Sequence, residues 1–315
     1  MAKKLITVFG ATGAQGGSLA RAILQDPESA FSVRAVTRDR ESAKAKELEQ
    51  MGAEVVSADI DDPSSVRKAL EDAYGAYFVT FYWAHYSPEK EKAEAKAYAQ
   101  AAKDAGLKHV IWSTLEDTRK WVPLASDQMP TLMDQYKVPH FDAKGESDQY
   151  FLELNVPTTF LLASFYWDNF IFFGSGPKKG PDGKLYLTFP LDDKKMAGIA
   201  SEDIGKAAYG IFKRGEEMIG KRIGIAGEQL TGEEMAQKMS KALGQEVIFN
   251  NVTPETFRAF GFPGSDDLGN MFQFYRDFEK DVNVIRNVEQ TKALNPSLQS
   301  FDEWLSKNAN RIPLE

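Results

Sequence analysis

Short apolar runs alternate with amphipathic stretches along the first half of the chain. Runs dominated by apolar or β-branched residues suit strands that are buried on both faces of a parallel sheet, and they fall at residues 5–9, 33–37, 54–58, 76–80, 109–112 and 157–163. The stretches between them repeat apolar positions at helical spacing, at residues 18–25, 39–51, 64–72, 87–105 and 140–154. This alternation predicts an α/β fold of the Rossmann type, a doubly wound parallel sheet with right-handed crossovers.

The pattern changes after about residue 165. Residues 174–183 are rich in Gly, Pro and Lys and are predicted to form a loop, and the later strands and helices are shorter. We expect a dinucleotide-binding Rossmann domain over residues 1–165 and a smaller α+β part over residues 166–315, with some segments returning to the sheet. The smaller part would bind substrate or partners. Residues 116–139 lack a periodic pattern, which predicts a long loop near the site.

Three glycines separate the first strand from the first helix. In such a turn Gly10 can take dihedral angles that a side chain forbids, Gly13 leaves room for a pyrophosphate, and Gly16 lets the helix approach the sheet. The helix N-terminus then offers unpaired N–H groups to the anion. A tight turn without a ligand is the alternative, but the flanking strand and helix favour a dinucleotide site. Its predicted contacts are Gly10, Thr12, Gly13, Ala14, Gln15 and Gly16.

The residue after the second strand indicates which dinucleotide binds. An acid at this place holds the ribose 2′-hydroxyl of NAD, whereas an arginine accommodates the 2′-phosphate of NADP. The chain has Arg38 here, and Arg40 and Lys44 follow it. Solvated charges that open a helix are the alternative explanation. We favour NADP(H) over NAD(H) as the cofactor.

Later strand ends carry further candidates, because ligands bind at the carboxyl edge of such sheets. Asp59, with Ile60 beside it, follows the third strand and could meet the adenine ring or cap the next turn. Thr80 and Phe81 end the fourth strand, and the aromatic residues from position 81 to 83 suit a ligand wall and core packing equally well. Ser113 ends the fifth strand.

Composition excludes several classes of protein. The chain has 315 residues and a formal net charge of −8, so direct nucleic-acid binding is not expected. It has no cysteine, which excludes disulfides, thiolate zinc sites and a cysteine nucleophile. No stretch has the features of a signal peptide or the length to span a membrane, so no membrane insertion is expected. These features favour a cytoplasmic protein, or also a nuclear one if the source is eukaryotic.

The glycine pattern, Ser113 and a lysine on the helix after the fifth strand resemble the short-chain dehydrogenase/reductase superfamily. The chain is more closely similar to the atypical NmrA-like branch, and within it to NADPH-sensor members. The similarity extends from about Lys3 to the C-terminus. It is carried by the segments FGATGAQGGSLA, VTR, PHFDAKGE, PDGKLY and GFPG with DLGNMFQFY.

The resemblance implies roles for several residues. Ordinary members carry Tyr-x-x-x-Lys, in which the tyrosine donates a proton and the lysine holds the nicotinamide ribose. Here the matching positions are His140 and Lys144, so the lysine is kept and the tyrosine is not. His140 could act as a general acid or as a hydrogen-bonded spacer, and we favour the spacer. The implied catalytic candidates are Lys144, His140 and Ser113, while Phe165 and Tyr166 match the segment under the nicotinamide.

Three functions follow from the resemblance. The first is an NADP(H)-binding redox sensor or regulator whose conformation or assembly depends on the cofactor and is read by protein partners, with a homodimer as one candidate assembly. The alternative is an NADPH-dependent reductase of a small carbonyl, quinone or related apolar substrate. The third is a partner of a transcription factor without catalysis. The chain offers no cysteine and no pattern that calls for a metal.

Overall fold

A seven-stranded sheet forms the first part of the computed structural model, which describes residues 2–314. Its strand order is β11-β6-β5-β4-β1-β2-β3, and every neighbouring pair from β3 to β6 is parallel. The order reverses between β1 and β4, which is the switch point of a doubly wound fold. The predicted fold class is confirmed. The strands are β1 (Lys4–Val8), β2 (Phe31–Thr37), β3 (Glu54–Ser57), β4 (Gly75–Phe78), β5 (His109–Thr114), β6 (Thr158–Leu162) and β11 (Arg222–Gly224).

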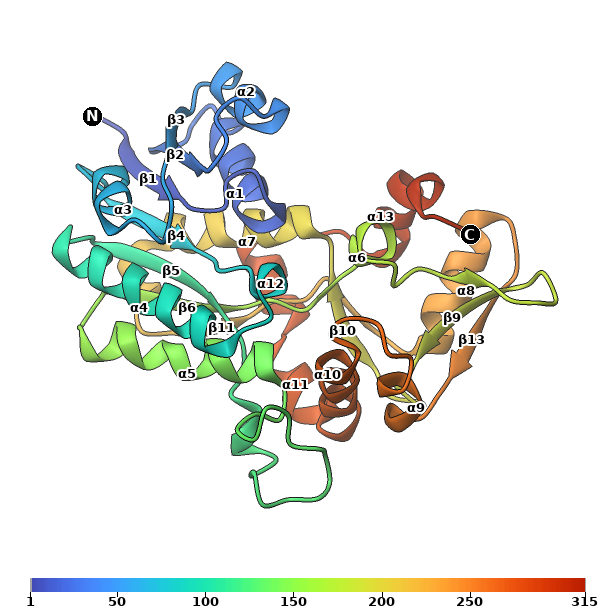
Figure 1. Ribbon diagram of the computed structural model, residues 1–315. Coiled ribbons are helices and arrows are strands. Elements are labelled where there is room, and N and C mark those ends of the chain that lie inside the picture. Colours follow the sequence, from blue (N-terminus) through green and yellow to red (C-terminus); the bar gives the residue numbers. More distant parts are fainter. Residues whose placement is uncertain (1, 315) are drawn as a thin grey trace. The chain divides into compact units, whose positions relative to one another are not determined.

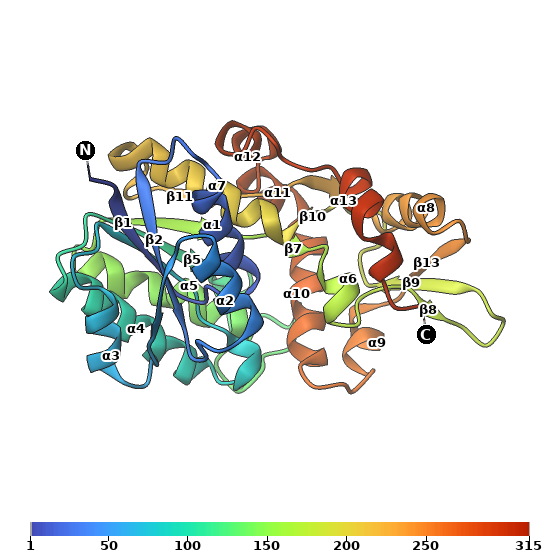
Figure 2. The ribbon, with the colours of Figure 1, turned by 90° about the horizontal axis from the view of Figure 1, so that it is seen from above.

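Helices cover both faces of this sheet, as Figure 1 shows. Helices α1 and α7 pack side by side on one face (Figure 2), where the hydroxyl of Ser18 donates to the carbonyl of Ser201 over 3.0 Å. Helices α3, α4 and α5 pack on the other face. The helices are α1 (Ala14–Leu24), α2 (Ala43–Gln50), α3 (Pro63–Ala69), α4 (Pro88–Asp104), α5 (Pro139–Glu153) and α7 (Ser201–Arg214).

Aromatic side chains fill the core between the sheet and helices α3 to α5. The rings of Phe78 and Tyr98 stack with centroids 4.5 Å apart, and those of Trp112 and Phe151 stack at 5.2 Å. All four side chains are buried. Burying such rings removes large apolar areas from water, and this packing holds β4 and β5 against α4 and α5.

Contacts along the chain divide it into two compact units. The first unit holds the chain up to Asp117, together with Ala143–Leu162 and Ser201–Ile223. The second holds Thr118–Asp142, Ala163–Ala200 and the chain from Gly224 onward. Segments with α7 and β11 thus return to the sheet, while the domain boundary at residue 165 stays a prediction.

The second unit contains two small sheets within the described residues. Their strand orders are β12-β10-β7 and β13-β9-β8, and helix α8 packs against β9 and β13 (Figure 1). The elements are β7 (Phe165–Tyr166), β8 (Lys178–Lys179), β9 (Leu185–Phe189), β10 (Met196–Ile199), β12 (Glu228–Leu230), β13 (Val247–Asn251), α6 (Asn169–Phe172), α8 (Gly232–Leu243), α9 (Pro254–Arg258), α10 (Ser265–Asp277), α11 (Glu279–Ile285), α12 (Val288–Leu294) and α13 (Phe301–Asn308).

Capping residues begin several of these helices. Thr231 and Glu234 form a reciprocal capping box at α8, which satisfies two backbone N–H groups. The C-terminal helix α13 buries Phe301, Trp304 and Leu305. Across residues 2–314, no helix combines the length and the apolar character that crossing a membrane requires.

Candidate functional site

The turn between β1 and α1 has the backbone geometry that its glycines predict. Gly10 has φ +65°, in the left-handed region that glycine favours. A Cβ atom at Gly16 would lie 2.5 Å from the carbonyl oxygen of Gly10, so only glycine lets the helix start this close to the strand. The N–H of Gly13 donates to that same carbonyl over 2.8 Å. Helix α1 begins at Ala14, four residues before the predicted start at Ser18, so the last glycines belong to its first turn.

The N-terminus of α1 is suited to an anion. Gly13 is its N-cap, and no side chain within residues 2–314 caps it. Its first turn contains no acidic residue, so nothing offsets the partial positive charge of the helix end. Gly13 and Ala14 lie at the surface, whereas the buried side-chain oxygen of Gln15 accepts a hydrogen bond from the hydroxyl of Tyr77. The turn thus presents backbone N–H groups to solvent and turns Gln15 inward.

Two candidates lie just beyond neighbouring strands. Strands β2 and β3 are parallel, with Thr37 opposite Ser57, so Arg38 and Asp59 extend past the same edge of the sheet. Both are exposed, and the guanidinium group of Arg38 has no hydrogen bond or ion pair with any described residue. The Asp59 carboxylate accepts the N–H of Asp61 over 3.0 Å, which is the turn-capping role.

Asp62 caps helix α3 by accepting the N–H of Ser64 over 3.0 Å. The structure therefore places the acids after β3 in capping roles, with Ile60 half-buried between them.

Lys144 and Thr80, both predicted from the sequence, lie in contact inside the first unit. The Lys144 ammonium donates to the hydroxyl of Thr80 over 2.6 Å, and its Nζ lies 2.6 Å from Oε1 of Glu91. It also lies 5.2 Å above the centre of the Trp112 ring. Lys144 and Thr80 are buried, and Glu91 is completely so. Because a buried charge needs a partner, Glu91 is the counter-charge that holds the Lys144 ammonium at the end of β4.

Hydrogen bonds to Asp148 fasten helix α5 to the sheet. The Asp148 carboxylate accepts the hydroxyl of Thr114 over 2.6 Å and the indole N–H of Trp112 over 3.1 Å, and it pairs with Arg222. Burial raises the pKa of Asp148, while Arg222 and these donors oppose the rise. Ser113, predicted at the end of this strand, is buried one residue before the end of β5. The structure thus brings Lys144 to Thr80, and the contacts of Lys144 do not include Ser113.

His85, Glu91 and Glu94 form a titratable cluster that the sequence prediction missed. Their ligand-type atoms all lie within 4.8 Å of one another. Burial raises the pKa of Glu94 to about 7, with a further contribution from the charge of Glu91. Burial also lowers the pKa of His85, against the attraction of Glu91. A signal existed in the sequence, because Glu91 shares the helical stripe of Ala95 and Tyr98, which faces the core.

His140 has a carboxylate partner within the second unit. Its Nδ1 lies 2.5 Å from Oδ1 of Asp267, and its backbone N–H donates to Oδ2 of the same carboxylate over 3.1 Å. Both side chains are buried. Asp267 lies in the first turn of α10, and sequence reasoning did not identify it. A carboxylate that binds both the ring and the backbone fixes the orientation of the imidazole.

The aromatic candidates have different surroundings. Phe81 is 54% exposed, whereas the neighbouring Tyr82 is buried in the short helix η1 (Tyr82–Ala84). Phe165 is buried in β7, with its ring centre 5.4 Å from that of Phe170, while Tyr166 is half-buried. Tyr82 and Phe165 are therefore packed in the interior, whereas the ring of Phe81 is largely exposed.

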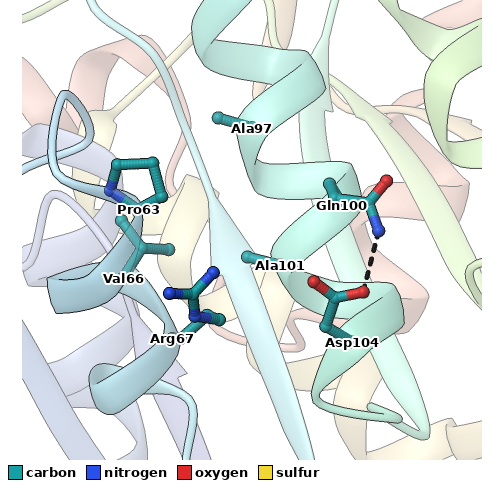
Figure 3. A pocket seen from close by; sticks show the side chains of 7 residues that line it. All are labelled: Pro63, Val66, Arg67, Ala97, Gln100, Ala101 and Asp104. Atoms are coloured by element: carbon teal, nitrogen blue, oxygen red, sulfur yellow. Dashed lines mark hydrogen bonds between the residues drawn. The ribbon is translucent and has the colours of Figure 1, made fainter.

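A shallow pocket between α3 and α4 contains none of the predicted site residues. Figure 3 shows its apolar floor and, at one side, Gln100 donating to Asp104 over 2.8 Å. It is lined by Pro63, Val66, Arg67, Ala97, Gln100, Ala101 and Asp104. Its walls offer few polar groups to fix a ligand.

Comparisons with known proteins agree on one family. Residues 2–305 match the model of the NmrA-like family. An NmrA-like family domain-containing oxidoreductase, FrzB, from a Cladobotryum species is 31% identical, over 86% of this chain and 83% of that protein. An NmrA-like family domain-containing protein of Dictyostelium discoideum is 27% identical, over 98% of each chain. Among solved structures, NmrA, a negative transcriptional regulator, in complex with NADP has a TM-score of 0.77 and 25% identity, over 98% of this chain and 95% of that one.

Proposed function

Because the chain belongs to the NmrA-like family, we propose that it binds NADP(H) at the turn between β1 and α1. One observation carries the proposal: the uncapped N-terminus of α1 follows Gly10 and contains Gly16 in its first turn, and it lies at the same edge of the sheet as the unpaired guanidinium of Arg38. This combination fits a pyrophosphate and a 2′-phosphate together. The NADP complex of the similar NmrA structure supports the same choice of cofactor.

Each part of the cofactor has a candidate holder. The N–H groups after Gly13 would bind the pyrophosphate, and Arg38 would bind the 2′-phosphate. Asp59 and Ile60 would line the adenine side, and Lys144 would hold the nicotinamide ribose beside Thr80. Phe81, exposed at the same edge, would cover the bound cofactor. When bound, NADPH supplies a hydride, and the chain's own residues orient it and provide the proton.

We propose a reductase as the activity, with a small carbonyl, quinone or related apolar substrate. A buried ammonium at Lys144 favours it, since this group can give a proton to an oxygen that gains charge during reduction. The oxidoreductase FrzB, at 31% identity, supports this class of reaction.

A second candidate is a redox sensor, in which NADPH occupancy changes conformation or assembly and protein partners bind the resulting state. It is favoured by His140, which stands where a tyrosine would donate the proton and which is held by Asp267. The similarity to a negative transcriptional regulator supports it as well. Such a sensor requires NADPH to bind one conformation more tightly than the other.

Calorimetric titration with NADPH and NADH tests the cofactor. We expect Arg38→Ala to weaken NADPH binding by about tenfold or more, since a charge-assisted hydrogen bond contributes about 1.5–3 kcal/mol. The affinity for NADH should stay unchanged. Arg214→Ala is the matched control, because Arg214 is a surface arginine at the far end of α7 that pairs with Glu217. Equal affinity of the unmodified chain for NADH and NADPH would contradict the role of Arg38.

A further inference from the structure

A buried carboxylate opposes the charge of Lys144 inside the first unit. The ammonium Nζ of Lys144 lies 2.6 Å from Oε1 of Glu91. The hydroxyl of Thr80 joins the two, because it accepts from Lys144 over 2.6 Å and donates to Glu91. Glu91 is completely buried, and the side chain of Lys144 is 10% exposed. Since little water reaches these groups, their charges are weakly screened.

The second oxygen of Glu91 keeps its negative potential. Oε2 makes no hydrogen bond with any residue that the structure describes, although Glu91 is completely buried. A buried carboxylate oxygen without a donor is costly, because nothing replaces the water that it has lost. The carboxylate therefore acts on its surroundings with a negative charge that hydrogen bonds reduce only at Oε1.

The imidazole of His85 adds no charge to this pair near neutral pH. Its Nδ1 accepts the N–H of Ser87 over 3.0 Å, so the neutral ring carries its proton on Nε2. Nε2 lies 3.4 Å from Oε2 of Glu91 and 4.0 Å from Oε2 of Glu94. Burial lowers the pKa of His85, against the attraction of Glu91. The ring is therefore a neutral group that lies between the two carboxyl groups.

Glu94 adds a negative charge that depends on pH. Burial raises the pKa of Glu94 to about 7, and the charge of Glu91 adds to this rise. The side chain of Glu94 is 11% exposed, so it can exchange protons with water directly. Glu94 is thus mostly neutral below pH 7 and mostly negative above it.

The other charged groups that face Glu94 compensate each other. Lys90 lies 3.7 Å from Glu94 and also pairs with Asp61 over 2.9 Å. Tyr98 stays neutral, since burial raises its pKa further above the neutral range. The charges around Lys144 therefore sum to about zero while Glu94 is protonated and to about minus one when it is ionised. The titratable groups that face Glu94 are Asp61, His85, Lys90, Glu91, Tyr98 and Lys144.

The two redox forms of the proposed cofactor differ in charge at the nicotinamide. The ring carries a positive charge in NADP⁺ and none in NADPH, while the phosphates are the same in both. An ammonium group beside the nicotinamide ribose favours the neutral ring, and a carboxylate in the same place favours the cationic one. In this chain both groups lie together, with Lys144 as the proposed holder of that ribose.

We propose that Glu91 and Glu94 set how strongly the site prefers NADPH over NADP⁺, by opposing the charge of Lys144. This role rests on the proposed NADP(H) site and deepens it. Glu91 lowers the cost of placing a cationic ring beside Lys144, and the ionised form of Glu94 lowers it further. Which redox form occupies the site, at a given ratio of NADPH to NADP⁺, then depends on these two acids and on pH.

Calorimetric titration with NADPH and with NADP⁺ tests the proposal without turnover. The quantity of interest is the Kd for NADP⁺ divided by the Kd for NADPH. Because both forms share the adenosine, the 2′-phosphate and the pyrophosphate, this ratio cancels a general loss of binding. We expect Glu91→Gln to raise the ratio about fivefold or more, since a nearby buried charge acts strongly on a second charge. Lys144→Met should lower the ratio by a similar factor.

Two controls separate charge from structure. Glu89→Gln removes an exposed acid of the same helix and should leave the ratio at its wild-type value. The double variant of Glu91→Gln and Lys144→Met removes both charges, so its ratio should return close to that of the wild type, which a packing defect would not produce. If Glu91→Gln does not fold, Lys144→Met and Glu94→Gln still decide. A ratio that stays at the wild-type value in every charge variant would overturn the proposal.

The pH dependence of the ratio tests Glu94. Ionised Glu94 favours the cationic ring, so the wild-type ratio should fall about twofold or more as pH rises from about 6 to about 8. The 2′-phosphate also titrates in this range, but it does so in both forms and cancels. Glu94→Gln should keep the ratio that the wild type has at low pH. An equal change with pH in the wild type and in Glu94→Gln would overturn the role of Glu94.

The same titrations distinguish this role from the proposed cofactor site. If the wild type binds neither NADPH nor NADP⁺, the cofactor site itself is wrong. If it binds both and Arg38→Ala weakens both, while no charge variant at Lys144, Glu91 or Glu94 moves the ratio, the cofactor site stands and the role of the two acids is wrong.

Discussion

The imidazole of His140 and the carboxylate of Asp267 are hydrogen-bonded, with Nδ1 and Oδ1 2.5 Å apart, although 127 positions separate them in the sequence. The carboxylate also accepts the backbone N–H of His140. This pairing joins the start of α5 to the first turn of α10 within the second unit. It gives His140 a structural partner at the position where the resemblance implies a proton donor.

Asp267→Asn should destabilise the fold. The substitution replaces a charge-assisted acceptor of the ring and backbone by an amide, and such bonds contribute about 1.5–3 kcal/mol. Urea unfolding should show that the free energy of unfolding decreases by this amount. Asp266→Asn is the control, because Asp266 lies in the same helical turn and is exposed, and it should change stability by less than about 0.5 kcal/mol. Equal effects of the two substitutions on the free energy of unfolding would mean that the contact between Asp267 and His140 does not stabilise the fold.

Gly13→Ala and Gly16→Ala should separate cofactor binding from folding. A Cβ atom at Gly16 would lie 2.5 Å from the Gly10 carbonyl, so its backbone must shift, whereas at Gly13 the same distance is 3.2 Å at an exposed position. We expect Gly16→Ala to lose both NADPH affinity and thermal stability. Gly13→Ala should lose affinity while its melting temperature stays close to that of the wild type. Calorimetry measures the NADPH affinity, and thermal unfolding measures the melting temperature. An unchanged NADPH affinity in Gly13→Ala would argue against pyrophosphate binding at this turn.

The stability of the chain should depend on pH through Glu94. Its pKa is raised from 4.5 to about 7 in the folded chain, so the folded state binds more protons than the unfolded state between these values. The folded state therefore loses stability as pH rises through this window. Glu94→Gln removes the effect, so its stability relative to wild type should increase from pH 5 to pH 8.

Denaturant unfolding at the two pH values checks this expectation. Glu89→Gln serves as the control, since its carboxylate is exposed and should give the same difference from wild type at both pH values. A relative stability of Glu94→Gln that stays constant or falls across the window would show that Glu94 titrates at its ordinary pKa.

Phe81→Ala and Tyr82→Ala should differ in how far they lower stability and in their effect on cofactor binding. Tyr82 is buried, so its truncation should cost about 3–5 kcal/mol in unfolding free energy, as for other buried aromatic side chains. Phe81 is 54% exposed, and its truncation should cost less than about 1 kcal/mol. If Phe81 covers the cofactor, Phe81→Ala should also weaken NADPH binding in fluorescence titration, and Tyr86→Ala, at a second exposed aromatic residue, should not.

The Rossmann sheet was predictable because its signals are local. Strands β1 to β6 are apolar runs in the sequence. The glycine turn and Arg38 each come directly after a predicted strand, and a residue after a parallel strand lies at the carboxyl edge of the sheet. Their position at this edge could therefore be predicted from the sequence. Lys144 was identified by its resemblance to a family lysine. Shorter elements were missed: β10 is Met196–Ile199, and a run of four residues without strong alternation gives no periodic signal.

The sequence by itself determined the fold class, the family and the glycine turn between β1 and α1, because each depends on residues that are close together in the chain. Tertiary structure alone decided the partners of the titratable groups. In the sequence, Glu91 is one of many charges on a predicted surface helix, whereas in the structure it is buried beside Lys144. His140 is a lone histidine in the sequence, whereas in the structure it is paired with Asp267 of α10. The physical reason is that burial and pairing fix the charge of an acid or a base, and both depend on segments that are distant in sequence.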